Sequence, residues 1–260
     1  MTKKLQNITN KTAPLAAVAV VVLIWYMCCD REVVPAYMLP SPSDVVRAFA
    51  DNFAVMLQQA AVTLQEACCG LLIGIVLAFI ISALMDRFAF LYKALYPLLV
   101  ISQTIPTIAI APLLVLWMGF GMAPKITLVV LTTFFPIAIG MLNGFAGVDG
   151  DAVNLMRAMG ADRYQIFRYV KLPNCAPSFF SGLRISASYA VVGAVVSEWL
   201  GGFEGLGVYM TRVKKAYAFD KMFAVIVFIS VISLLLMFLV SVLEKAAMPY
   251  KKKEKTVTEN

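Results

Sequence analysis

The chain has 260 residues, of which 61% are hydrophobic and only 14% are charged. Soluble domains are about half apolar and about a quarter charged, so this composition excludes an ordinary soluble protein and indicates one integral membrane domain. The net charge of +7 comes from basic residues at the chain ends and in one central loop, which indicates membrane orientation rather than nucleic-acid binding. The chain has no histidine, which removes the commonest general base and metal ligand.

The first apolar segment covers residues 14–29 and follows a polar stretch with three lysines. This layout resembles a signal peptide, but no A-x-A cleavage site follows it. We therefore expect an uncleaved first transmembrane helix. The five cysteines form two adjacent pairs and a singleton without a CxxC spacing, so we interpret them as small apolar fillers rather than a disulfide framework.

Prolines between residues 33 and 42 should prevent a continuous helix there. Ser43 then suits an N-cap, and Asp44 is favourable at the positive end of the following helix. Apolar residues at helical spacing as far as Leu57 predict an amphipathic helix lying in the membrane interface.

Five further apolar runs are each near the ~20 residues that cross a bilayer. They cover about 62–85, 91–118, 125–145, 178–199 and 222–243, and Pro97, Pro106 and Pro112 interrupt the second of them. With the first helix, they predict an all-α integral membrane bundle of six helices. We expect one domain over residues 1–260, with a core at about 60–245, a loop at about 146–177 and a basic tail at 249–260.

Lysine and arginine set the expected orientation. With the N-terminus inside, fifteen of them fall on inner segments and seven on outer segments. This bias predicts that both termini are cytoplasmic and that the chain is a multi-pass protein of the bacterial cell membrane. The basic cluster from Arg212 to Lys221 falls on the outer side and is an exception to the rule that lysine and arginine are enriched on cytoplasmic segments.

The central loop predicts two short helices. Asp149 or Asp151 can cap a helix running to Met159, and Gly160 can end it in a left-handed conformation. A second helix is expected over residues 162–171, stopping before Pro173.

This spacing resembles the cytoplasmic loop of ABC importer permeases, E-A-A-x3-G-x9-I-x-L-P, with Gly160, Val170 and Leu172-Pro173 at the matching positions. Asn154-Leu155-Met156 replaces Glu-Ala-Ala, and Asp151 could supply the acidic group. The resemblance implies the type I importer permease fold and coupling helices that dock on a cytoplasmic ATPase dimer. The implied coupling residues are Asp151, Asn154, Leu155, Met156, Gly160, Ala161, Phe167, Leu172 and Pro173.

Other motifs extend the resemblance over nearly the whole chain. Gln103-Thr104-Ile105-Pro106 and Trp117-Met118-Gly119-Phe120-Gly121 resemble the nitrate, sulfonate and taurine group of permeases. Phe179–Arg184 and Gly193–Trp199 are most similar to permeases for thiamine-precursor pyrimidines. The resemblance therefore implies a hydroxymethylpyrimidine-type solute, with nitrate, sulfonate, taurine or riboflavin-like solutes as alternatives.

Two segments are candidates for the translocation pathway. Ser102, Gln103 and Thr104 lie in the proline-interrupted run, where freed carbonyls need protein or a wet cavity. Ser186, Tyr189 and Glu198 lie in the run after the loop. In this run, small residues recur every four positions from Gly182 through Ser186 and Ala190 to Ala194, with Glu198 at the next such position, a spacing that also fits ordinary helix packing. Glu198 ends this run, so we expect an interfacial carboxylate. Thr63, Gln65 and Glu66 begin an earlier run and carry the same ambiguity.

The function expected is therefore a permease subunit without enzymatic activity. The sequence has no G-x4-G-K-[ST] motif, so ATP and Mg²⁺ are expected on the partner ATPase and no cofactor on this chain. An extracytoplasmic binding protein would deliver the solute, and a second permease copy would complete a homodimer, although a heterodimer stays open. Membrane lipid is the surrounding partner, and no catalytic residue, metal site or nucleic acid is expected. An ion-coupled secondary transporter is a distant alternative.

Overall fold

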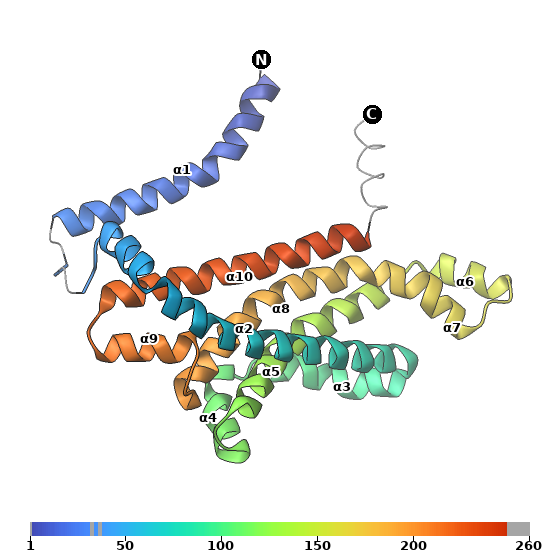
Figure 1. Cartoon of the computed structure of the whole chain (residues 1–260). Helices are drawn as coiled ribbons and strands as arrows, with labels where there is room; N and C mark the ends of the chain where they lie inside the picture. The colour runs from blue at the N-terminus through green and yellow to red at the C-terminus, as the bar shows by residue number, and fades with distance from the viewer. Residues whose placement is uncertain (1, 32–33, 36–37, 249–260) are drawn as a thin grey trace. The chain divides into compact units, whose positions relative to one another are not determined.

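The computed structural model describes residues 2–31, 34–35 and 38–248, and all the regular elements in this part of the chain are helices (Figure 1). The predicted all-α class is confirmed. The chain folds as two compact units, Met1–Gln58 with Tyr209–Phe228, and Gln59–Val208 with Ile229–Asn260. The predicted basic tail at 249–260 lies outside the described residues.

The first unit contains α1 (Thr2–Asp30), the beginning of α2 (Pro42–Arg87) and the beginning of α10 (Phe219–Ala247). Trp25 of α1 donates a 3.1 Å hydrogen bond to the carbonyl of Pro40, and its ring stacks on Phe223 with 5.8 Å between centroids. An edge-on contact of 5.6 Å between Phe49 and Phe228 joins α2 to α10. Aromatic packing therefore holds this unit together.

Helix α2 is one continuous helix of 46 residues. The prediction of a separate interfacial helix before the span at 62–85 is therefore wrong, and the physical reason is that no proline or glycine separates the two segments. The predicted cap is also displaced, because the Ser41 hydroxyl accepts from the Asp44 amide at 3.2 Å and Pro42 is the first helical residue. Proline suits this position, where the missing amide has no helical partner.

The proline-rich run forms a broken pair, α3 (Ala89–Ser102) and α4 (Thr107–Met118), bent by 101°. Of the three prolines expected to interrupt it, only Pro106 stands at the break, where it precedes the first residue of α4. Pro97 and Pro112 lie inside the two helices.

Helices α5 (Met122–Ala146) and α8 (Leu172–Gly201) approach closely because small residues line their crossing. A Cβ atom on Gly140 would lie 2.6 Å from the carbonyl oxygen of Ser178, and one on Gly182 would overlap the carbonyl of Pro136. The spacing of small residues on α8 therefore serves helix packing.

Within the described residues, four helices are long and apolar enough to cross a membrane, or five if the bent pair counts as one span. The apolar part of the first helix, Ala16–Asp30, is shorter than these spans. The chain is thus a multi-pass helical membrane protein, whereas the predicted count of six rests on counting this shorter helix.

Candidate functional site

The first candidate site is the turn between two short helices, α6 (Gly150–Ala158) and α7 (Arg163–Ile166). The Asp149 carboxylate caps α6 by accepting from the Asp151 amide at 2.9 Å. Beyond α6, Gly160 has φ +84°, its amide donates to Arg157 at 2.9 Å, and the Ala161 amide donates to Met156 at 3.0 Å. These two bonds form a Schellman motif, so Gly160 ends the helix as the sequence predicted.

A capping box starts α7 immediately after this turn. The Asp162 carboxylate accepts from the Gln165 amide at 2.7 Å, while the Gln165 side chain accepts from the Asp162 amide at 2.8 Å. Both ends of the turn are therefore fixed by short-range hydrogen bonds, and its geometry is set locally.

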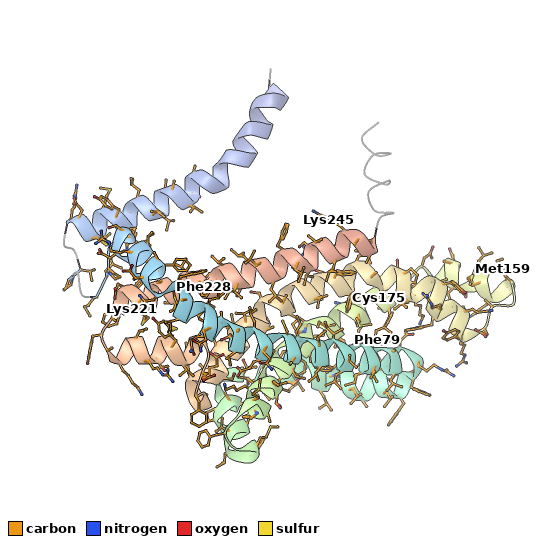
Figure 2. The ribbon with its side chains drawn as sticks, in the orientation of Figure 1. Phe79, Met159, Cys175, Lys221, Phe228 and Lys245 are labelled. Atoms are coloured by element: carbon orange, nitrogen blue, oxygen red, sulfur yellow. The ribbon has the colours of Figure 1, made fainter. Side chains whose placement is uncertain are left out.

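Large apolar side chains are exposed around this turn. Leu155 is 63% exposed and Met159 is 74% exposed, and Figure 2 shows Met159 at the tip of the turn. Asp151 and Asn154 are exposed on the same helix, while Met156 is half-buried. Exposed apolar residues rimmed by polar ones are typical of a protein–protein contact surface.

Pro173 does not end the second helix, contrary to the prediction. The chain continues helically from Arg163 to Gly201, through a π-helical turn, η1 (Phe167–Lys171). The Leu172 amide donates to the carbonyl of Phe167, five residues back. This wider turn places Pro173 in the first turn of α8, where its missing amide is tolerated. Phe167 packs on Phe145 of α5 at 5.6 Å, so the α7 end is anchored to the bundle.

The candidate pathway residues at the broken pair donate side-chain hydrogen bonds to the last turn of α3. Ser102 and Gln103 both donate to the carbonyl of Leu99, at 2.9 and 3.4 Å, and Thr104 donates to Ile101 at 2.7 Å. Carbonyls near the break thus obtain partners from local side chains. Gln103 and Thr104 stay exposed.

The other candidate pathway residues, all on α8, differ in their exposure to solvent. Ser186 is buried and donates a 2.7 Å hydrogen bond to the carbonyl of Thr133 on α5, whereas Tyr189 is exposed. Glu198 is only 1% exposed. The expectation that it is an interfacial carboxylate is therefore wrong, because neighbouring helices supply enough donors to bury it.

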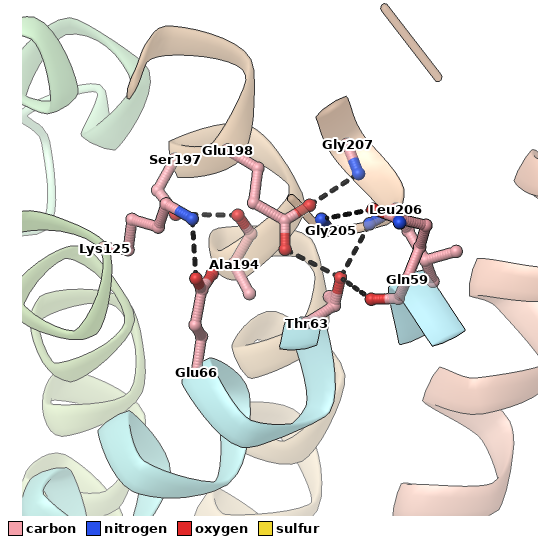
Figure 3. A network of polar contacts seen from close by, with 10 residues as sticks. All are labelled: Gln59, Thr63, Glu66, Lys125, Ala194, Ser197, Glu198, Gly205, Leu206 and Gly207. Carbon is pink, nitrogen blue, oxygen red and sulfur yellow. Dashed lines mark hydrogen bonds and ion pairs between the residues drawn. The ribbon is translucent and has the colours of Figure 1, made fainter. Parts of the chain in front are cut away.

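Glu198 is the centre of a buried polar network (Figure 3). Its carboxylate accepts from the Thr63 hydroxyl of α2 at 2.7 Å and from the Gly207 amide at 2.5 Å. The Thr63 oxygen in turn accepts from the Leu206 amide at 2.9 Å, and the Gln59 side chain accepts from the Gly205 amide at 2.7 Å. Together these bonds satisfy three amides at the start of α9 (Leu206–Lys215), a helix that the sequence analysis did not predict.

A buried ion pair lies beside this network. The Lys125 ammonium is 2.6 Å from the Glu66 carboxylate, and both side chains are almost fully enclosed. The sequence analysis named Glu66 as an ambiguous candidate and did not single out Lys125. The signal available was an isolated lysine at the start of an apolar run, because ionisable residues at such positions need a partner.

The described residues contain no group of three or more His, Cys, Asp or Glu side chains that could hold a metal ion. The site thus consists of an exposed turn whose backbone is fixed by local hydrogen bonds and, at the other end of α8, a buried polar network.

Known proteins share this organisation. The family described as binding-protein-dependent transport system inner membrane component matches residues 70–248. A probable ABC transporter permease protein of Haemophilus influenzae is 39% identical over 86% of this chain and 92% of its own. The formylaminopyrimidine transport permease protein ThiX of Halalkalibacterium halodurans is 37% identical over 89% of this chain and 93% of its own.

Solved structures agree at the level of the fold. The MetNI methionine ABC transporter has a chain that superposes with a TM-score of 0.66 at 21% identity, covering 75% of this chain and 97% of that chain. The chain therefore belongs to the binding-protein-dependent transport system inner membrane components and is the multi-pass, non-enzymatic permease subunit of an ABC importer, whose ATPase is a separate subunit.

Proposed function

We propose that this permease imports a thiamine-precursor pyrimidine of the hydroxymethylpyrimidine type, as a homodimer coupled to an ATPase dimer through the α6–α7 turn. The single observation that carries the coupling role is the turn itself. It exposes Leu155 and Met159 while local caps on both sides fix its backbone. A rigid handle of this kind can transmit the closure of a motor subunit to the bundle.

The continuity of the chain beyond the turn supports the same proposal. Helix α7 continues through η1 into α8 without a break, so a push on α7 moves a membrane helix directly. Of the residues assigned to coupling, Asp151, Asn154 and Gly160 are exposed beside the turn, and Phe167 and Leu172 are half-buried along the connecting helix.

The proposed orientation places both termini and the α6–α7 turn in the cytoplasm. The excess of lysine and arginine on those segments supports it. In this orientation the loop before α9 and the Glu198 network lie toward the outer side, where the solute-binding protein docks.

The broken pair is the proposed pathway segment. Gln103 and Thr104 are exposed at a helix break, which is the kind of position that lines transport paths. Tyr189 is exposed on α8 and joins them in the proposal. Ser186 and Glu198 are buried in packing contacts, so we assign them supporting roles.

The substrate class rests on relatives. The 37% identical relative is named for formylaminopyrimidine transport, whereas a riboflavin permease protein of Chloroflexus aurantiacus is 32% identical and a putative aliphatic sulfonate permease protein of Bacillus subtilis is 30% identical. The higher identity favours the pyrimidine.

Uptake into proteoliposomes tests the proposal. The complete complex, with its own binding protein and ATP inside, should accumulate labelled hydroxymethylpyrimidine or formylaminopyrimidine, and unlabelled riboflavin, taurine or nitrate should not compete. Uptake of riboflavin or a sulfonate in place of the pyrimidine would replace the substrate assignment. ATP-independent uptake driven by an ion gradient would reject the ATPase coupling.

A further inference from the structure

A cavity of about 840 Å³ lies between the end of α2 and the α6–α7 segment. Apolar α2 side chains, among them Phe79, Ile80 and Leu84, line part of the cavity, and charged residues from the end of α2 and from the α6–α7 segment line another part. The charged and polar lining comprises Asp86, Arg87, Arg157, Asp162, Arg163, Tyr164 and Lys171. The cavity is therefore amphipathic, with an apolar wall and a basic rim.

The positive charge of this rim is only partly neutralised. Lys171 is paired with Asp86 at 2.6 Å, and the Asp162 carboxylate is engaged in the α7 capping box. Among the described residues, no ion pair engages Arg87, Arg157 or Arg163. Three guanidinium groups thus border one cavity with no carboxylate bound to them.

The apolar wall belongs to a helix that can cross the bilayer. Phe79, Ile80 and Leu84 are 39%, 48% and 44% exposed on α2, which is long and apolar enough to cross a membrane. Figure 2 marks Phe79 on this helix. From Ile80 to Arg87 the helix rises by roughly 10 Å, so one ligand can reach both the apolar wall and the arginines. Arg87 ends α2, where a membrane surface is expected.

We infer that this cavity binds an anionic phospholipid, with its phosphate among Arg87, Arg157 and Arg163 and an acyl chain along Phe79, Ile80 and Leu84. Arginine forks match phosphate oxygens in a bidentate geometry. A soluble anion would contact only the arginines, whereas a lipid contacts both the arginines and the apolar α2 side chains. The exposed Leu155 and Met159, which carry the proposed ATPase contact, do not line the cavity, whereas Asp162 and Phe167 do. The lipid would therefore lie beside the surface proposed for the ATPase. The bound lipid would tie the coupling segment to the membrane surface.

Native mass spectrometry of the purified permease–ATPase complex tests this inference. The complex is titrated with phosphatidylglycerol or with phosphatidylcholine of the same chains. The wild type should bind phosphatidylglycerol more tightly than phosphatidylcholine. The triple variant Arg87→Gln, Arg157→Gln, Arg163→Gln should bind phosphatidylglycerol on the order of 100-fold more weakly, because each lost charge costs about fivefold and the three factors multiply. Arg168→Gln is the matched control, because Arg168 is an exposed arginine of the same segment outside the cavity.

Arg→Lys variants at the three positions should lower the affinity less than the glutamine variants do, because lysine keeps the positive charge and loses only the bidentate geometry. They therefore separate loss of charge from loss of folding. If the glutamine triple variant fails to assemble, Arg87→Gln alone should show the fivefold loss. Unchanged phosphatidylglycerol binding in the triple variant, or no preference over phosphatidylcholine in the wild type, would overturn the inference. Displacement of the lipid by inorganic phosphate would also overturn it, because the arginines would then bind a soluble anion. If the triple variant lost the ATPase but still bound phosphatidylglycerol, the arginines would serve the ATPase instead.

Discussion

Lys125 of α5 and Glu66 of α2 form an ion pair of 2.6 Å inside the helical bundle, with neither side chain open to solvent. The two residues are 59 positions apart in the sequence, so the pair fixes how α2 and α5 meet. The neighbouring Thr63–Glu198 bond, 2.7 Å long, adds α8 to the same assembly.

Replacing Lys125 by Met should destabilise the protein by about 3–5 kcal/mol, because Glu66 would stay buried without its partner. The free energy of unfolding in mixed detergent micelles measures this loss. The double variant Lys125→Met, Glu66→Leu should recover most of it, since no buried charge is left. Lys93→Met, at an exposed lysine, is the control, and an equal loss there would contradict the role of the pair.

Replacing Gly205 by Ala should detach the loop that precedes α9. A Cβ atom at this position would overlap the Glu198 carboxylate, and the backbone has φ +119°. We expect a loss of stability about twice that of Gly119→Ala, which has a positive φ of +77° but open space around it. Thermal unfolding and limited proteolysis of the loop give the comparison. Equal effects of the two variants would show that the contact with Glu198 is unimportant.

Proline at Gly160 should abolish ATP-driven uptake while the protein still inserts and assembles with the second copy. Proline fixes φ near −65°, which is incompatible with the observed +84°, and it removes the amide that bonds to Arg157. Gly150→Pro is the matched control, because Gly150 is the first residue of α6, a position that suits proline. Normal uptake by the Gly160 variant would refute the coupling role of the turn.

Cysteines introduced at Ala161 or Asp162, in a background whose native cysteines are replaced by alanine, should crosslink to the ATPase. Both residues follow Gly160 in the exposed turn, whereas a cysteine at Glu204, in the loop before α9, should not react with the ATPase. Crosslinked species are counted on denaturing gels of the intact complex. Absence of crosslinks from both turn positions would place the ATPase elsewhere.

Replacing Gln103 by Leu should raise the KM for uptake about fivefold, which corresponds to one lost hydrogen bond of about 1 kcal/mol. Gln103 is exposed at the helix break, and its bond to Leu99 is long at 3.4 Å, so its amide is available to a solute. Thr127→Val removes a hydroxyl that bonds back to Ala123 on α5 and serves as the control. An unchanged KM would remove Gln103 from the pathway.

Features with a local cause could be predicted from the sequence. Long apolar runs specify membrane helices, and the Gly160 turn follows from glycine's access to a left-handed backbone. The capping role of Asp149 is likewise a matter of a few neighbouring residues. The motif around Gly160 and Leu172-Pro173 was sufficient to indicate the family.

Features that depend on distant partners could not be predicted. Glu198 was expected at an interface, but donors from Thr63 and Gly207 allow it to be buried. The helix was expected to stop before Pro173, but it continues through a π-helical turn into α8, and Phe167 of that turn packs on the distant Phe145 of α5. The sequence by itself determined an all-helical membrane permease with a capped turn, because apolar length and glycine chemistry act within a few residues. Only the tertiary structure decided that Lys125 meets Glu66 and that arginines from two segments border one cavity, because pairing of buried charges depends on which helices pack together.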